Sequence, residues 1–406
     1  MTLATEQGIP ATRTRALALA GLAIAITALN LRTAVTGFTP LLEIIGEHLG
    51  YGVALAGLLG TVPTASFAVF GFLAPVVTRR FGLERTATVA LALTAVSLMV
   101  RAVAPTPGVL VLSTILALAG IGAANVVIVP LVKAWFPHRL ALWTSLYLIL
   151  MQTGQFVAPL IAVPVTDATS WRFSVGMWAV PGVIAAIVWF AITRIRPEDV
   201  HTAGPAAPAP APFSVSRSAT AWGLVGLFAT LSMANYGIVT WLPTVLTDAG
   251  ANPATGGTML GLYSVWGVAA AFVVPKIATR MDNPFIVVVA CAALLIAGYT
   301  GLIVSPLGAT VLWVCLLGVG VSTFPLCMTL INRRTRSAQA ASTVSGFVQG
   351  IGYALACVAP LGLGLLRDAT GSWTVPLIAL AATTIPGAVA GWFACRPRFV
   401  EPETAH

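Results

Sequence analysis

The sequence predicts an all-α membrane protein with twelve transmembrane helices arranged as two six-helix bundles. Of its 406 residues, 58% are hydrophobic and only 8% are charged, whereas about 25% of the residues in soluble domains are charged. Apolar stretches of about 20 residues, the length that crosses a bilayer core of about 30 Å, recur along the whole chain. The stretches after the midpoint also repeat short motifs found before it.

The predicted spans follow one another with short polar breaks and a single long one. That break, Arg194–Ser218, is rich in Pro and Ala and is expected to be an extended linker. We therefore expect an N-terminal bundle over 1–194, a cytoplasmic linker over 195–218 and a C-terminal bundle over 219–406. The predicted spans are 16–42, 51–78, 84–104, 108–134, 140–164, 172–194, 219–247, 254–279, 283–304, 307–331, 338–366 and 371–394.

Basic residues alternate between the loops in a way that sets the orientation. With the N-terminus inside, 17 of the 21 Lys and Arg residues fall on the inner side. Three fall on the outer side (Arg101, Arg172 and Arg367), and Arg32 lies within a span. The positive-inside rule then predicts a multi-pass protein of the inner (cytoplasmic) membrane with both termini in the cytoplasm. No basic patch with interleaved aromatics occurs, so we expect no nucleic-acid partner.

The second half of the chain repeats the first. VAPLIAVPVTDATSW (157–171) matches VAPLGLGLLRDATGSW (358–373), each running from the fifth span of its half into the following loop. Related matches near the second and fourth spans occur in the same order. Parallel repeats of this kind are typical of carriers whose binding site lies between the two bundles.

Arg32 is the only charged residue that we place near the middle of a span. A guanidinium at the bilayer centre costs about 2.5–3.5 kcal/mol on insertion scales, so it is usually retained where it faces a wet cavity or a partner. One interpretation is a structural Arg32 bonded to backbone carbonyls or to a buried carboxylate. The other, which we favour, is a charged group in a substrate pathway.

Other polar and aromatic residues fall at similar depth on several spans. Each of them also has a structural interpretation, because membrane Asn and Gln often bond neighbouring helices and Tyr or Trp often only pack. Their convergence on one depth favours a substrate pocket with a few polar groups among aromatics. With Arg32, the expected substrate-binding residues are Asn30, Thr36, Asn125, Gln152, Gln155, Asn235, Tyr236, Tyr263, Trp266, Gln349 and Tyr353.

Several longer motifs carry a family resemblance. ALNLRTAVTGFTPLL, GFLAPVVTRRFGLERT, GIGAANVVIVPLVKAWFPHR and GVGVSTFPLCMTLINRRTRS resemble the cyanate/2-nitroimidazole (CynX/NimT) family of the major facilitator superfamily, over Ala28 to Trp373. The superfamily's loop after the second span is matched here except that Pro75 stands where an acidic residue is common. The expected gating residues of this cytoplasmic motif are Gly71, Pro75, Arg79, Arg80, Gly82 and Arg85.

The resemblance implies a secondary active transporter for a small solute that works by alternating access. Because Arg32 has no acidic neighbour at its depth, a small anion or a nitro-bearing azole fits the predicted pocket better than a cation. Proton-coupled efflux of small toxic compounds is the alternative, and coupling to H+ or to a counter-substrate stays open.

A different class of function, a non-transporting receptor or an enzyme on this fold, is not favoured. An intramembrane hydrolase would need a Ser/His or metal set at membrane depth. The four histidines fall in loops, a linker or the terminus: His48, His138, His201 and His406. We expect no enzymatic activity, no metal and no cofactor, with the lipid bilayer and a small-molecule substrate as partners and a monomer as the assembly.

Overall fold

A computed structural model describes residues 11–194, 214–336 and 338–401. They form helices joined by short turns, and no strand occurs among them. The first half contains α1 (Ala11–Thr36), α2 (Leu42–Leu49), α3 (Val53–Phe81), α4 (Leu83–Ala102), α5 (Pro107–Trp135), α6 (Leu140–Ala168), α7 (Trp171–Gly176) and α8 (Ala179–Thr193). The second contains α9 (Ala219–Asp248), α10 (Pro253–Arg280), α11 (Phe285–Val304), α12 (Thr310–Gly320), α13 (Thr323–Arg333), α14 (Ala338–Ala356), α15 (Val358–Thr370) and α16 (Thr374–Cys395).

Helices of membrane-crossing length and apolarity account for most of the chain. Among the described residues, 11 helical segments meet both criteria. The remaining predicted span, 254–279, is the 28-residue helix α10, several of whose side chains lie outside the described part. Large apolar side chains point outward from the bundle, for example Val89 and Ile385, each 67% exposed. Such side chains are stable on an outer surface when lipid surrounds it, so the all-α membrane prediction is confirmed.

The structure divides four of the predicted spans in two, and each break is followed by a proline. Pro40 lies in the short 3-10 helix Thr39–Leu41 that precedes α2. Pro181, Pro325 and Pro360 each stand third in α8, α13 and α15. Proline is tolerated in the first turn of a helix, where its missing N–H would have no partner, but it interrupts a continuing helix. The positions of these prolines therefore agree with the breaks, although hydropathy alone predicts each span as continuous.

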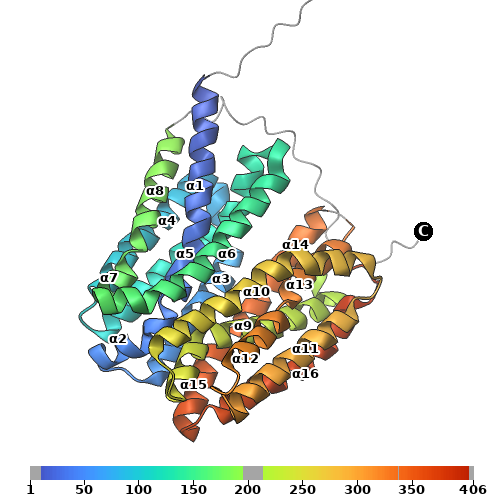
Figure 1. Cartoon of the computed structure of the whole chain (residues 1–406). Helices are drawn as coiled ribbons and strands as arrows, with labels where there is room; N and C mark the ends of the chain where they lie inside the picture. Colours follow the sequence, from blue (N-terminus) through green and yellow to red (C-terminus); the bar gives the residue numbers. More distant parts are fainter. Residues whose placement is uncertain (1–10, 195–213, 337, 402–406) are drawn as a thin grey trace, which may run out of the picture.

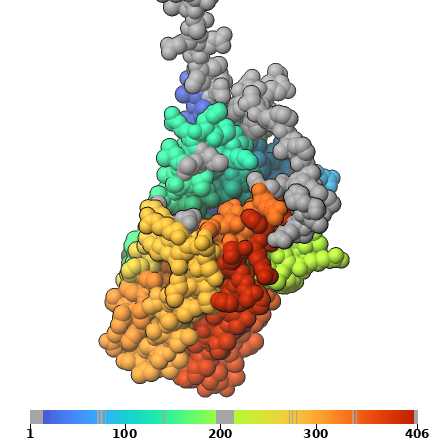
Figure 2. Space-filling view, turned by 90° about the vertical axis from the view of Figure 1, so that its right-hand side faces the viewer, coloured from blue at the N-terminus to red at the C-terminus, as the bar shows by residue number. Residues whose placement is uncertain are grey.

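The two halves stand side by side and meet along a few helices. Within the first half α4 packs against α5 and α8, and within the second α9 packs against α16. Between the halves α6 packs against α10, and α3 packs against α14 and α15 (Figure 1). In Figure 2, α6 in teal borders α10 in yellow. Of the predicted linker, only the part from Ser214 onward belongs to the described residues.

Candidate functional site

Arg32 lies on α1 at the junction of the two halves. Its Nη1 donates a hydrogen bond to the Tyr236 hydroxyl of α9, with 3.4 Å between the two atoms. The guanidinium carbon lies 5.4 Å from the centre of the Phe67 ring of α3. The side chain is half-buried, its Nε has no partner, and no carboxylate among the described residues pairs with it. The cation is therefore held by an aromatic ring and a phenol rather than by an opposite charge.

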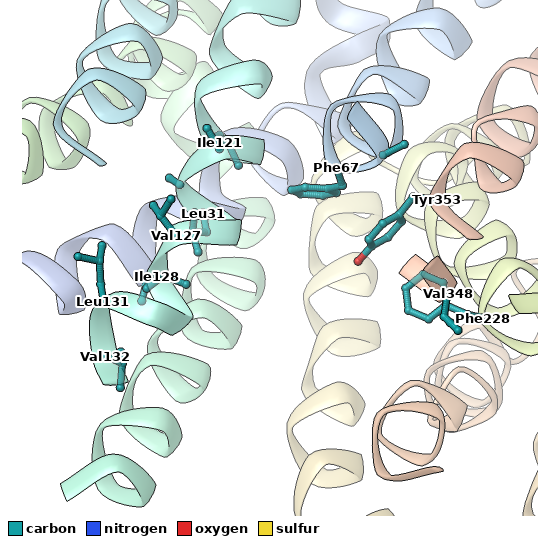
Figure 3. Packing of buried hydrophobic residues seen from close by; sticks show 14 of the residues in the cluster. Leu31, Phe67, Ile121, Val127, Ile128, Leu131, Val132, Phe228, Val348 and Tyr353 are labelled. Atoms are coloured by element: carbon teal, nitrogen blue, oxygen red, sulfur yellow. The ribbon is translucent and has the colours of Figure 1, made fainter. Parts of the chain in front are cut away.

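Four aromatic side chains from both halves form a connected group beside this cation. Phe67 lies 5.5 Å from the Tyr353 ring of α14, and Tyr353 lies 6.2 Å from Tyr236. Phe228 packs edge-on against Tyr353 at 4.9 Å. Figure 3 shows Phe67 reaching from its helix towards Tyr353, with Phe228 beyond it. We call Arg32 together with these four rings the Arg32 cluster.

A second polar group lies inside the C-terminal half. The Tyr263 hydroxyl of α10 donates to Asn235 Oδ1 at 3.1 Å. Trp266, one turn along α10, packs so tightly on α12 that a Cβ added to Gly318 would lie 2.6 Å from its ring. Tyr263 is 2% exposed. Asn235, Tyr263 and Trp266 thus pack within their own half, beside the helix that carries Tyr236.

Asn30, Thr36 and Asn125 of the first half take different positions. Asn30 faces α8: its Oδ1 accepts from Thr33 at 3.1 Å, and its amide nitrogen would lie 2.9 Å from a Cβ added to Gly182. Two positions along a helix are a rotation of about 200°, so Asn30 and Arg32 point to opposite sides of α1. The Thr36 hydroxyl donates to the Arg32 carbonyl at 3.1 Å, while Asn125 is half-buried on α5.

The glutamines lie on the helices that flank the junction. The Gln152 amide nitrogen of α6 would lie 2.8 Å from a Cβ added to Gly267 of α10, so it fills the contact between the halves. Gln155 is half-buried one turn further along α6. On α14, the Gln349 amide donates to the Ser345 hydroxyl at 2.7 Å. Of all the expected binding residues, the structure brings only the two tyrosines Tyr236 and Tyr353 directly around Arg32.

Among the described residues, hydrogen bonds join the halves at mid-depth and towards the end that contains α2, which we call the closed end. There the Thr247 hydroxyl donates to Glu43 Oε2 at 2.8 Å, joining α9 to α2. The Thr61 hydroxyl of α3 donates to the Cys357 carbonyl at 3.3 Å. The closed end lies opposite the start of α1, at the bottom of Figure 1.

At the opposite end, two adjacent arginines join helices within the C-terminal half. Arg333 donates to the carbonyl of Met281 at 2.8 Å and also to that of Ala278, just where α10 ends. Arg334 donates to the Cys395 carbonyl at 2.6 Å. Burial, together with the charge of Arg333, lowers the pKa of Arg334 from its ordinary value. These cations complement the negative C-terminal ends of helices.

The gating motif is only partly described. The side chains at Gly71, Pro75 and Arg79 lie outside the described part of the chain. Arg80 is exposed, with its guanidinium carbon 5.6 Å from the Phe81 ring, and Arg85 is exposed as well. Gly82 has φ 82°, a backbone conformation that favours glycine, and it separates α3 from α4.

Comparison with known proteins agrees with this architecture. Residues 21–360 match the model of the Major Facilitator Superfamily. The chain belongs to the major facilitator superfamily.

Two related transporters are similar to this chain over most of its length. This transporter is 30% identical over 384 residues to the 2-nitroimidazole transporter of Escherichia coli, covering 92% of its own length and 95% of the relative's. It is 26% identical over 357 residues to the cyanate transport protein CynX of the same organism, with coverages of 87% and 91%. The expected resemblance to that family and small-solute transport are confirmed.

A solved structure shares the fold. The inward-facing, unoccupied structure of a bacterial homologue of the human lysosomal transporter Spinster superposes with a TM-score of 0.73 at 15% identity, covering 95% of this chain and 97% of that chain. The chain is thus a multi-pass membrane transporter with the superfamily's fold.

The structure of this transporter shows that Arg101 is buried, which the sequence did not predict. Arg101, which the loop pattern placed on the outer side, stands near the end of α4 and is only 1% exposed. A second arginine besides Arg32 therefore lies between helices of the bundle, where it contacts α1. The residue stands one position before the end of its span. Hydropathy does not show there whether a side chain is exposed in a loop or buried against neighbouring helices.

Phe67 and Phe228 were not expected in the cluster. Both sit in apolar stretches in which a phenylalanine that faces lipid and one that faces the junction look alike. Helix periodicity does not separate the two, because lipid and a buried contact are equally apolar. The rotation of α3 and α9 in the folded bundle determines that these two side chains face the cluster and not the lipid.

Proposed function

We propose that this transporter carries a small anion, or a small planar solute with a nitro or carboxylate group, and that Arg32 binds it. The observation that supports the proposal is the position of Arg32: a cation without a described carboxylate partner, at mid-depth, in contact with Tyr236 of the opposite half. A ligand bound there would touch both halves at once, as alternating access requires.

The surroundings of the guanidinium favour a flat ligand. Arg presents its donors in a planar fork that matches carboxylate and nitro groups. Phe67, Tyr236 and Tyr353 are 4–6% exposed and offer ring faces and edges at the same depth. An anion also neutralises the buried charge, whereas a cationic ligand would add to it.

We further propose how the two ends alternate. The loop charges support an orientation in which the closed end would lie on the outer face of the inner membrane, and the described conformation would then open towards the cytoplasm. The N-terminal bundle 1–194 and the C-terminal bundle 219–406 would rock about the Arg32 cluster. Opening outward would then break the Thr247–Glu43 and Thr61–Cys357 hydrogen bonds.

The test is counterflow transport in proteoliposomes with cyanate, nitrate, small carboxylates and 2-nitroimidazole as candidate substrates. Arg32→Gln should abolish saturable transport of the accepted substrate, while Arg32→Lys should retain part of it because the charge remains. Arg172→Gln is the matched control, since Arg172 is an exposed arginine on α7. Wild-type rates in a folded Arg32→Gln protein would refute the role assigned to Arg32.

A further inference from the structure

Arg101 is a buried cation, and most of its hydrogen-bonding capacity is unused. Its Nη2 donates to the Ala34 carbonyl of α1 at 3.2 Å, and its guanidinium carbon lies 4.4 Å from the centre of the Phe38 ring. The Nε and Nη1 atoms are buried and have no partner among the described residues. Buried charged groups are normally paired, because leaving one uncompensated is strongly unfavourable.

Arg101 faces a small cavity between the halves, on the closed-end side of Arg32. Thr114 of α5 lines the same cavity, and its hydroxyl is also buried without a partner. The opposite wall comes from the C-terminal half and includes Tyr236 and Thr240. The centre of a water molecule has about 10 Å³ in which to move, which is room for one particle of a single heavy atom.

The unused groups favour an anion in this cavity. Two of the three are N–H donors on a permanently charged guanidinium, and the hydroxyl can donate as well. No carboxylate among the described residues lines the cavity. A metal cation would therefore be repelled, and an organic carboxylate or azole would exceed the space.

We propose that this cavity binds a small monovalent inorganic anion of the halide class, held by Arg101 and Thr114. Because both halves line it, a bound ion would stabilise the conformation in which the closed end is shut. Tyr236 lines this cavity and also accepts the hydrogen bond from Arg32, so the ion would sit next to the proposed substrate position without occupying it. The proposal for this site does not depend on which solute Arg32 binds.

The experiment is a chloride and bromide titration of the purified full-length protein in gluconate buffer at constant ionic strength, read by thermal unfolding. A saturable rise in Tm of about 2–4 °C is expected at an ion concentration of about 100 times the Kd. Arg101→Gln and Thr114→Val should lose or weaken the rise. Arg32→Gln and the exposed control Arg172→Gln should keep it, which separates this site from the proposed substrate site.

A second readout does not depend on variants that fold. Crystals of the wild-type protein grown in bromide should show an anomalous peak beside the Arg101 guanidinium. A density without anomalous signal there would identify water and overturn the proposal. A Tm rise that persists in folded Arg101→Gln protein, or that is absent in the wild type, would overturn it as well.

Discussion

Replacing Gly57 with alanine should open the closed end. Gly57 of α3 lies so close to α15 that a Cβ would come within 2.9 Å of the Pro360 carbonyl and 3.3 Å of the Leu361 Cα. It would also come within 3.1 Å of the Trp241 ring, which is 3% exposed. That ring is fixed in turn, because its Nε1 donates to the Pro360 carbonyl at 2.8 Å.

The magnitude follows from how little these neighbours can move. Two of the three are backbone atoms, so relieving the overlap requires α3 and α15 to separate. Overpacking of this kind costs about 1–3 kcal/mol. If that cost falls only on the shut conformation, the equilibrium between shut and open moves by about 5- to 150-fold.

The assay is maleimide labelling of a cysteine placed at Thr39, which is 6% exposed and lines the cavity beside Arg101. The background lacks the five native cysteines. Labelling from the closed-end side should accelerate within the 5- to 150-fold range in Gly57→Ala protein. Gly52→Ala is the control, because Gly52 has an extended backbone and no atom within 4 Å of an added Cβ. Equal labelling rates in the two variants, with unchanged Tm, would refute the reasoning.

Three further predictions each concern one polar side chain. Tyr236→Phe should change the KM for the carried solute by no more than about tenfold, because a 3.4 Å bond is weak and the Arg32 charge remains; a complete loss of transport would contradict this. Asp248→Asn breaks an ion pair with Arg367 whose side chains are 28% and 25% exposed, so unfolding measurements should show a loss of about 1 kcal/mol or less that vanishes at high salt. Tyr51 donates to the Leu42 carbonyl at 2.8 Å, and burial raises its pKa above the ordinary value of about 10. This contribution to stability is complete below pH 10 and is lost as the pH rises further, so between pH 9 and 11 the Tm of the wild type should fall more steeply than that of Tyr51→Phe.

Hydropathy located the helices well because the bilayer leaves the backbone few alternatives. The predicted spans 283–304 and 371–394 correspond to α11 (Phe285–Val304) and α16 (Thr374–Cys395) within a few residues. The breaks within four other spans were not predicted, since the apolar stretch continues through them. A proline follows each break, but a proline alone does not show from the sequence whether the helix ends there or continues with a kink.

The candidate site was predictable where charge was the signal. Arg32 stood out because a cation inside an apolar span needs a reason, and the structure places it at the junction of the halves. Asn30 is equally polar but faces α8, since the direction of each side chain depends on how α1 is rotated in the bundle. The burial of Arg101 was not predicted, because the residue stands at the end of its span, beside the outer loop. The packing of the helices determines which polar residues contact one another, and the local sequence does not predict that packing.

Equilibrium binding to purified protein tests the central claim most directly. Wild-type, Arg32→Gln and Arg172→Gln proteins would be titrated by isothermal calorimetry with the solute that counterflow identifies, in a fixed gluconate buffer. The account predicts saturable 1:1 binding to the wild type and to Arg172→Gln, and none to Arg32→Gln. Undiminished binding to folded Arg32→Gln protein would contradict it.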